Sequence, residues 1–196
     1  MQATDIERIL VDVDGTLCWN LPRICEFVDR EYGVEVTPAE IDAWDYRFEP
    51  AGVDIDEVIG RLFTDHPEWF LSDLEPVPGA RQALEMLSTA GHEIQIVTHR
   101  PAETHHLTRQ WLDDYGFTYD QFVSDVPANK AEVPGDVLVD DYHGHVADAA
   151  DAGMLGVLFD RPYSEPVDRE RAIRVSTWSD VLETLELEPE LLGTDV

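Results

Sequence analysis

Two aspartates at the end of a short apolar run near the start of the chain are the residues best suited to chemistry. Residues 9–14 form a β-branched run that ends in Asp12 and Asp14, and Gly15 and Thr16 form a turn after it. Open α/β sheets bind ligands at the carboxyl ends of their strands. Adjacent carboxylates there repel each other, so a divalent cation or a raised pKa must compensate. The alternative interpretation is an Asp-Gly turn that only ends a strand.

Three more polar features occupy comparable places further along the chain. Thr98 ends the apolar run at residues 94–98, and the pair Asp140 and Asp141 ends the run at residues 137–140. Lys130 lies in a loop between these two runs and is the only lysine among 196 residues. Since the carboxyl ends of parallel strands meet at one sheet edge, these residues are candidates for one site.

The elements that must position these residues follow an alternating pattern. Strands are predicted at residues 9–14, 94–98, 137–140, 155–159 and 173–175, with a weaker candidate at 122–123. Helices are predicted at residues 80–90, 102–115, 145–152 and 179–187. Strands that alternate with helices of this length predict a parallel sheet covered on both faces.

Residues 18–77 interrupt the alternation. They contain two amphipathic helical stretches, at residues 24–32 and 55–63. We therefore expect a small helical cap above the carboxyl edge of the sheet. The predicted organisation is a core of residues 1–17 and 78–187, a cap of residues 18–77, and a C-terminal tail of residues 188–196.

Taken in chain order, these features resemble the four motifs of the haloacid dehalogenase superfamily of phosphohydrolases. The resemblance spans residues 8–160, which is nearly the whole predicted core. It implies a Rossmann-like α/β fold, with a parallel sheet sandwiched by helices and a small helical cap inserted after the first strand. It also implies Mg²⁺-dependent hydrolysis of phosphate monoesters. The matching positions are Asp12-Val13-Asp14-Gly15-Thr16-Leu17, Thr98, Lys130 and Asp140-Asp141.

The resemblance assigns a role to each acidic residue. Asp12 would be the nucleophile that forms an aspartyl-phosphate. Asp14 would protonate the leaving oxygen and then deprotonate the attacking water. An acid at this second position favours phosphoryl transfer over dehalogenation. Mg²⁺ would be held by Asp12, by the backbone carbonyl of Asp14 and by one carboxylate of the later pair. Asp141 is preferred as the direct ligand, and Asp140 is the alternative.

Four further residues are candidates for binding the substrate phosphate. Thr98 would donate a hydrogen bond to a phosphoryl oxygen, unless it is simply a β-branched strand residue. Lys130 would neutralise the phosphate and the nucleophile together, since phosphoryl transfer requires positive charge around the equatorial oxygens. His99 and Arg100 follow the threonine. Arg100 would either reach the phosphate from the start of the next helix or balance the charge of Asp141.

The substrate implied by the resemblance is a small phosphorylated metabolite, with a nucleoside monophosphate as the leading candidate. The short interval between Lys130 and Asp140 and the size of the cap are most similar to the deoxyribonucleotidase-like branch. Arg23 and Arg47 would bind a second anionic group or form surface ion pairs. Six cap aromatics would either stack on a base or form the cap's own core: Trp19, Trp44, Tyr46, Phe48, Trp69 and Phe70.

Composition narrows the class of partner and the compartment. The net charge is −29 and the pI is about 4.2, which argues against binding to nucleic acid and to anionic membranes. No apolar run approaches the ~20 residues of a membrane-spanning helix, and the N-terminus does not resemble a signal peptide. We therefore expect a cytoplasmic protein. Cys18 and Cys25 are expected to be free buried thiols, and the sequence leaves the oligomeric state open.

The basic residues suggest a high-salt environment. Lys130 is the single lysine among 13 basic residues, so the other twelve are arginine. An acidic chain nearly free of lysine resembles the proteins of salt-loving archaea, where molar salt shortens the Debye length to ~3 Å and screens self-repulsion. An acidic protein of an ordinary mesophile is the simpler alternative.

Other functions compete with the phosphatase hypothesis. A two-component receiver domain uses similar residues in a different chain order, which argues against it. A non-catalytic relative that binds a phosphometabolite or serves as a scaffold remains an alternative, and so does a polynucleotide end-phosphatase, although the acidic composition disfavours the latter. His143 and His145 either ligate a transition metal or belong to a loop that leads into a helix.

Overall fold

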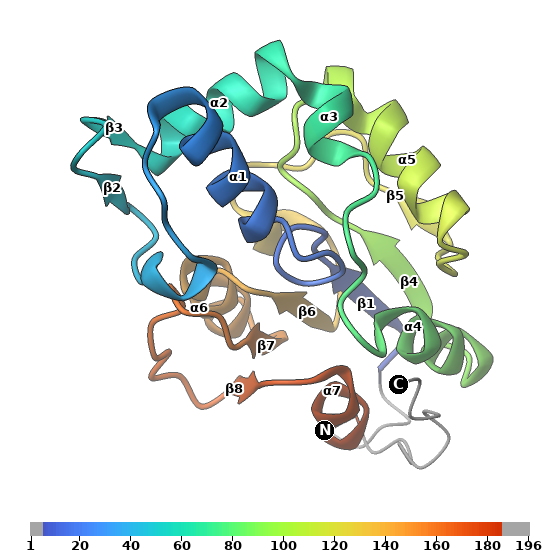
Figure 1. Ribbon diagram of the computed structural model, residues 1–196. Helices are drawn as coiled ribbons and strands as arrows, with labels where there is room; N and C mark the ends of the chain where they lie inside the picture. Colours follow the sequence, from blue (N-terminus) through green and yellow to red (C-terminus); the bar gives the residue numbers. More distant parts are fainter. Residues whose placement is uncertain (1–5, 186–196) are drawn as a thin grey trace.

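The computed structural model describes residues 6–185 and has a six-stranded parallel sheet at its centre (Figure 1). The strand order is β5-β4-β1-β6-β7-β8, which confirms the predicted α/β fold class. The weak strand candidate is confirmed as β5. The predicted tail at residues 188–196 lies outside the described residues. The strands are β1 (Arg8–Val11), β4 (Glu93–Ile96), β5 (Gln121–Phe122), β6 (Val137–Asp140), β7 (Leu155–Phe159) and β8 (Ala172–Val175).

The two central strands are apolar on both faces, as the sequence predicts for a sheet covered on both sides. Ile9 and Val11 of β1 join a large apolar cluster on one face of the sheet. Leu10, which lies between them, joins a separate cluster on the other face with Leu138 of β6. All four side chains are completely buried. This burial on both faces fixes the register of β1 against β6, and therefore fixes the position of the residues that follow them.

Helices cover both faces of the sheet. Buried residues of α4, α5 and α7 belong to the larger cluster, whereas α6 and the segment around Val133 contribute to the smaller one. The helix predicted at residues 102–115 begins with a 3₁₀ turn, η3, before α5. The helix predicted at residues 145–152 begins two residues earlier than expected. The helices are α4 (Ala80–Thr89), η3 (Ala102–Thr104), α5 (His105–Asp114), η4 (Lys130–Glu132), α6 (His143–Asp151) and α7 (Trp178–Thr184).

The segment between β1 and α4 lies above the sheet, on the side toward which β4 points (Figure 1). Its two predicted helices are confirmed as α1 and α2, while a two-stranded hairpin and the helix α3 were not predicted. Residues 18–77 as a distinct cap stay a prediction, because Phe27 and Leu62 share one apolar cluster with Ile9 of the sheet. The elements are α1 (Leu21–Tyr32), η2 (Pro38–Glu40), β2 (Arg47–Phe48), β3 (Val53–Asp54), α2 (Ile55–Asp65) and α3 (Pro67–Leu71).

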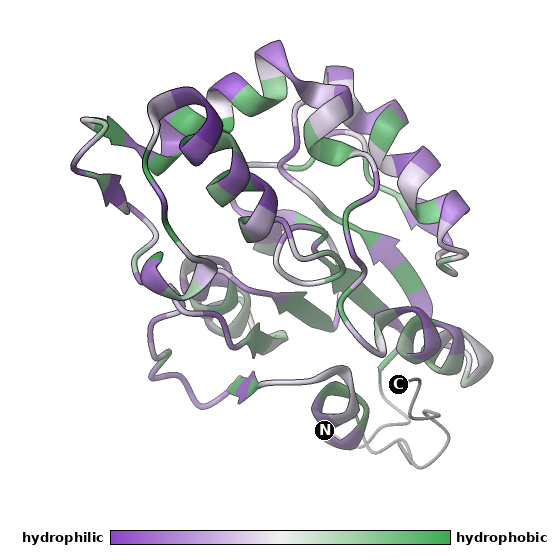
Figure 2. Cartoon of the chain, in the orientation of Figure 1, coloured by the Kyte–Doolittle hydropathy of each residue, from purple (hydrophilic) through white to green (hydrophobic). Residues whose placement is uncertain are grey.

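The surface pattern agrees with the predicted amphipathic helices. Figure 2 shows hydrophobic and hydrophilic residues alternating around α1, α2 and α5, as expected of helices that bury one face. Within residues 6–185, no helix is both long enough and apolar enough to cross a membrane. Cys18 and Cys25 are free and buried, which confirms the expectation for both thiols.

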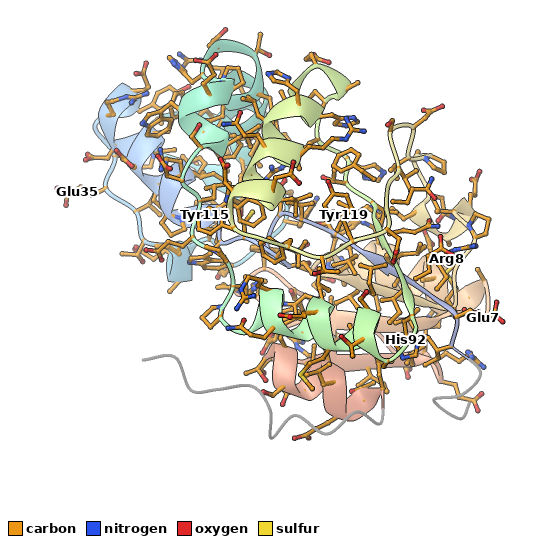
Figure 3. The ribbon with its side chains drawn as sticks, turned by 90° about the vertical axis from the view of Figure 1, so that its right-hand side faces the viewer. Glu7, Arg8, Glu35, His92, Tyr115 and Tyr119 are labelled. Carbon is orange, nitrogen blue, oxygen red and sulfur yellow. The ribbon has the colours of Figure 1, made fainter. Side chains whose placement is uncertain are left out.

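Polar contacts anchor the amino ends of the central strands, where Glu7 and Arg8 lie on the side of the molecule away from α1 and α2 (Figure 3). The side chain of Asp136 accepts hydrogen bonds from the backbone N–H groups of Glu7 and Arg8, each at 2.9 Å. The Arg8 guanidinium pairs with Glu93 at 3.0 Å. These contacts join the amino end of β1 to both neighbouring strands. They therefore help to fix where the carboxyl end of β1 lies.

Candidate active site

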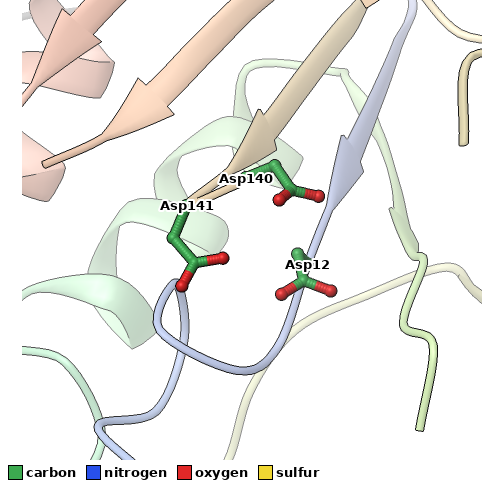
Figure 4. Close-up of side chains that lie close together, drawn as sticks. All are labelled: Asp12, Asp140 and Asp141. Atoms are coloured by element: carbon green, nitrogen blue, oxygen red, sulfur yellow. The ribbon is translucent and has the colours of Figure 1, made fainter. Parts of the chain in front are cut away.

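Three of the predicted metal-binding aspartates converge at the carboxyl edge of the sheet (Figure 4). Asp12 follows β1, Asp140 ends β6, and Asp141 is the next residue. Because β1 and β6 are adjacent and parallel, these carboxylates face the same space. Each offers an oxygen atom within 4.8 Å of the other two, and all three residues are buried.

Lys130 lies against two of these carboxylates. Its Nζ donates to Asp12 Oδ1 at 2.6 Å and to Asp140 Oδ2 at 2.7 Å. The lysine side chain is only 2 % exposed, so the ammonium ion is almost completely desolvated. Asn129 starts the short η4 helix by accepting a hydrogen bond from the backbone of Ala131 at 2.8 Å, which directs Lys130 inward.

One ammonium group does not balance three buried carboxylates. Burial raises the pKa of Asp12 to about 6, with the Lys130 ammonium opposing the rise and the Asp140 carboxylate adding to it. Burial and the neighbouring carboxylates Asp140 and Asp12 also raise the pKa of Asp141 well above its ordinary value. Burial acts in the same direction on Asp140, but Lys130 and His145 outweigh it and lower the pKa. This cluster of oxygen ligands with excess negative charge fits a hard divalent cation such as Mg²⁺.

Asp14 lies apart from the three-carboxylate cluster and is paired with Arg100. The guanidinium Nε donates to Asp14 Oδ2 at 2.8 Å, and Nη2 donates to Asp14 Oδ1 at 2.7 Å. Burial opposes ionisation of Asp14, but the Arg100 charge outweighs it and lowers the pKa of the carboxyl group. The Arg100 guanidinium contacts Asp14 rather than Asp141, and a contact between Arg100, which lines the cavity, and a substrate phosphate stays a prediction.

Thr98 and His99 both line the cavity above the carboxylates. The Thr98 side chain is buried, and its Oγ1 accepts from the backbone N–H of Arg100 at 3.2 Å. His99 Nε2 lies 2.9 Å from the carbonyl oxygen of Pro127. Burial lowers the pKa of His99, and the contact with Pro127 offsets this only in part. The lowered pKa favours the neutral form of the His99 ring.

The turn after Asp14 requires glycine because Asp141 approaches its backbone closely. Gly15 has a φ of +71°, and a Cβ atom there would lie 1.8 Å from Asp141 Oδ2. The same carboxylate accepts a hydrogen bond from the hydroxyl group of Tyr163. Ser164 Oγ donates to the Asp141 carbonyl oxygen at 3.0 Å. The Asp-Gly sequence therefore does more than end a strand, since it brings the first motif against Asp141.

A cavity of about 250 Å³ opens above the carboxylates. This volume lies just below the ~300–1,000 Å³ range of small-molecule sites. Trp44, 44 % exposed, contributes to the wall, and its ring lies 4.3 Å from that of Tyr142, centroid to centroid. The remaining upper wall is mainly apolar and comes from α1, α2, α3 and the loop before the hairpin: Leu21, Ile24, Ala43, Ile55, Ile59, Phe63 and Phe70.

Only two of the six cap aromatics that the sequence singled out line this cavity, Trp44 and Phe70. Each of the other four packs against a neighbouring side chain: Trp19 on Arg161, Trp69 on Arg30 and Arg23, and Tyr46 on Phe48.

The two cap arginines are not cavity residues. Arg23 donates to the carbonyl oxygen of Trp69 at 2.6 Å, and Arg47 pairs with Asp54 at 2.5 Å. Packing against neighbouring side chains therefore accounts for four of the six aromatics, and local contacts account for both arginines.

Several cavity residues were missed by sequence reasoning. Tyr142 and Tyr163 line the cavity, but their types alone did not mark them. His145 Nδ1 lies 3.2 Å from Asp140 Oδ2, whereas His143 Nδ1 accepts from the backbone of Glu165 at 3.3 Å. The two histidines thus have different partners, and the metal-ligand group found within residues 6–185 includes neither. Both lie in the first turn of α6, so the prediction of a loop there is wrong.

Comparison with known proteins agrees with this arrangement. Residues 5–189 match the family model described as "5' nucleotidase, deoxy (Pyrimidine), cytosolic type C protein". A Chlorobaculum tepidum protein named "Putative 5'(3')-deoxyribonucleotidase" is 29 % identical over 123 residues. That alignment covers 59 % of this chain and 57 % of the relative, so the chain matches little more than half of the relative's length.

Two solved structures have the same fold. A haloacid dehalogenase-like hydrolase from Streptococcus pneumoniae is 16 % identical with a TM-score of 0.61, covering 92 % of this chain and 99 % of that one. A HAD phosphatase from Thermococcus onnurineus is 21 % identical with a TM-score of 0.53, covering 94 % of this chain and 100 % of that one. At these identities the likeness establishes the haloacid dehalogenase-like fold alone.

Proposed function

We propose that this protein is a Mg²⁺-dependent phosphatase of small phosphate monoesters. The proposal starts from the family to which the chain belongs, 5' nucleotidase, deoxy (Pyrimidine), cytosolic type C. Nucleoside monophosphates are the proposed substrates, and the cytoplasm is the proposed compartment. One observation carries the proposal. The carboxylates of Asp12, Asp140 and Asp141 and the ammonium of Lys130 meet at the floor of a small cavity whose upper wall is apolar.

In the proposed reaction, a carboxylate oxygen of Asp12 attacks the phosphorus atom. The bond between phosphorus and the ester oxygen breaks, and that oxygen takes a proton from Asp14 as the alcohol leaves. Water then attacks the phosphorus of the aspartyl-phosphate and gives a proton to Asp14. The bond between phosphorus and Asp12 breaks, which releases inorganic phosphate and restores both carboxyl groups.

The positive charge around the phosphate would come from two sources. Lys130 is already within hydrogen-bonding distance of the nucleophile, so it is placed to neutralise Asp12 and a bound phosphate together. Asp12, Asp140 and Asp141 would hold Mg²⁺, which when bound supplies charge to stabilise the transferring phosphoryl group. The backbone carbonyl of Asp14 is the predicted further ligand, and Thr98 the predicted hydrogen-bond donor to a phosphoryl oxygen.

The cavity supports a small substrate with a flat, apolar part. Its wall is lined by aliphatic and aromatic side chains, and the ring of Trp44 is partly open to solvent. An aromatic ring of this kind can stack on any base. The small volume and the net charge of −29 both argue against the end of a polynucleotide as substrate. A binding protein without turnover would use the same residues, so activity must be measured to separate the two.

Phosphate release from purified protein tests the proposal. The assay compares nucleoside monophosphates with sugar phosphates, in the presence of Mg²⁺ or EDTA, in dilute buffer and in about molar KCl. The wild type is compared with Asp12→Asn and with the matched control Asp114→Asn, which changes an exposed aspartate at the end of α5. We expect Mg²⁺-dependent release by wild type and by the control, and none by Asp12→Asn. A folded wild type that binds Mg²⁺ but releases no phosphate would favour the binding protein.

A further inference from the structure

We infer that Arg100 is a positioning residue for Asp14. It holds the Asp14 carboxylate so that one oxygen atom, Oδ2, stays free to exchange a proton in the cavity. The inference rests on the proposed function, in which Asp14 donates and accepts that proton. It is an alternative to the expectation that Arg100 binds the substrate phosphate directly. Three observations support the inference: the geometry of the Arg100–Asp14 pair, the surroundings of each Asp14 oxygen, and the contacts that hold Arg100.

Each nitrogen atom of the Arg100 guanidinium has a hydrogen-bond partner within the protein. Its side chain has 0 % exposed surface. Nε and Nη2 form a two-pronged contact with Asp14, at 2.8 and 2.7 Å, and Nη1 donates to Thr108 Oγ1 at 3.1 Å. A planar guanidinium fixes both the position and the plane of a carboxylate, which a lysine ammonium cannot do. Arg100 therefore specifies how Asp14 is oriented.

The two oxygens of Asp14 have different surroundings. Oδ1 also accepts from Asn20 Nδ2 at 3.2 Å and lies 3.6 Å from Cys18 Sγ. Within the described part of the chain, Oδ2 has a hydrogen bond only from Arg100 Nε. The Asp14 side chain is 26 % exposed and lines the cavity. Oδ2 thus keeps a lone pair available, while Oδ1 is saturated.

Arg100 is itself held by the start of α5. His105 Nε2 lies 2.9 Å from the Arg100 carbonyl oxygen, and Thr108, which contacts the guanidinium, is completely buried. Thr108 Oγ1 also donates to the carbonyl oxygen of Thr104 at 3.4 Å. The orientation of Asp14 therefore depends on α5, the helix that follows β4. In the sheet, β4 lies on the opposite side of β1 from β6, the strand that carries Asp140.

The consequence for the reaction depends on the leaving group. As the bond between phosphorus and the ester oxygen breaks, an alkoxide leaves slowly unless Asp14 Oδ2 gives it a proton. A p-nitrophenolate is stable as an anion and leaves without that proton. Misplacing a catalytic group by about 1 Å costs on the order of 10²-fold in rate. A displaced Asp14 should therefore slow alkyl esters far more than aryl esters.

The test measures kcat/KM, which includes the steps up to release of the alcohol, for a nucleoside monophosphate and for p-nitrophenyl phosphate. Arg100→Met should lower kcat/KM about 100-fold for the nucleotide and only about tenfold for the aryl ester. Arg100→Lys keeps the charge but not the two-pronged contact, and should show the same preference with a smaller loss. It also serves as the informative variant if Arg100→Met does not fold.

A double-mutant cycle separates positioning from general structural support. If Arg100 acts through Asp14, then Asp14→Asn combined with Arg100→Met should be no slower than Asp14→Asn alone. Equal losses on both esters, or additive losses in the double variant, would overturn the inference while the wild type remains a phosphatase. A wild type that hydrolyses neither ester would instead overturn the proposed function, and the inference with it.

Discussion

Replacing Lys130 by methionine should destabilise the fold strongly when no divalent cation is present. The lysine ammonium is 2 % exposed and lies 2.6 Å from Asp12 and 2.7 Å from Asp140. Removing one partner of a buried ion pair costs about 3–5 kcal/mol, because the remaining charge stays desolvated. For a chain of this size each kcal/mol lowers the melting temperature by about 2–4 °C. The expected fall is therefore about 6–20 °C.

Thermal unfolding followed by circular dichroism measures this fall. The experiment belongs at about pH 8, so that Asp12, whose pKa burial raises to about 6, is ionised in the folded protein. Arg169→Met is the matched control, because it removes a basic residue whose pairing with Asp151 is exposed to solvent. We expect no resolvable change for that variant. Mg²⁺ should raise the melting temperature of Lys130→Met more than that of the wild type, since it replaces the missing positive charge.

The result that would refute this reasoning is a Lys130→Met protein that melts with the wild type in EDTA. The carboxylates of Asp12, Asp140 and Asp141 would then have to be accommodated without a neighbouring cation. In that case the excess negative charge would not support the presence of a divalent ion at this site.

Three further predictions follow from other parts of the structure. Gly15→Ala should weaken Mg²⁺ binding about 10–100-fold by calorimetric titration, because its Cβ would displace the Asp141 carboxylate. Trp44→Ala should leave the melting temperature unchanged, since the ring is 44 % exposed, yet raise KM for nucleoside monophosphates about 5- to 150-fold if a base stacks on it. Raising KCl toward about 1 M should increase the melting temperature, because salt screens the net charge of −29; a flat response would disfavour the halophile hypothesis.

The sheet and its motif residues could be predicted because each depends on a local pattern. Apolar runs such as residues 137–140 are short, β-branched and bounded by turn residues, which specifies buried strands. Parallel strands then bring their carboxyl ends to one edge without further information. Asp12 and Asp140 meet for this reason, although 128 positions separate them in the numbering of the chain.

The partners of Arg100 could not be predicted in the same way. Asp14 lies 86 positions before it, and spacing alone does not decide which of several nearby carboxylates a guanidinium contacts. That choice depends on the path of the chain between β4 and α5. Tyr163 is a similar case, since it reaches Asp141 from the loop after β7.

Short elements were missed for a different reason. The hairpin strands β2 and β3 have two residues each, too few to show an alternation of apolar and polar residues. The helix α3 has five residues and follows α2 after one intervening residue, His66. These elements matter because α3 and the segments that flank the hairpin supply part of the cavity wall, so the shape of the cavity is what the sequence reveals least.

Asp12 and Asp14 are two positions apart, but the fold gives them opposite electrostatic environments. Burial raises the pKa of Asp12 to about 6, whereas the Arg100 guanidinium overcomes burial and lowers the pKa of Asp14. A bound divalent cation would lower the pKa of Asp12 in turn, because the charge of a metal ion dominates its neighbours. The lowered pKa favours the carboxylate form of Asp14, which accepts a proton from the attacking water, and it opposes the proton donation of the first step. In the proposed reaction the arginine therefore helps hydrolysis of the aspartyl-phosphate through its charge, whereas its contribution to protonation of the leaving oxygen is the positioning of Asp14.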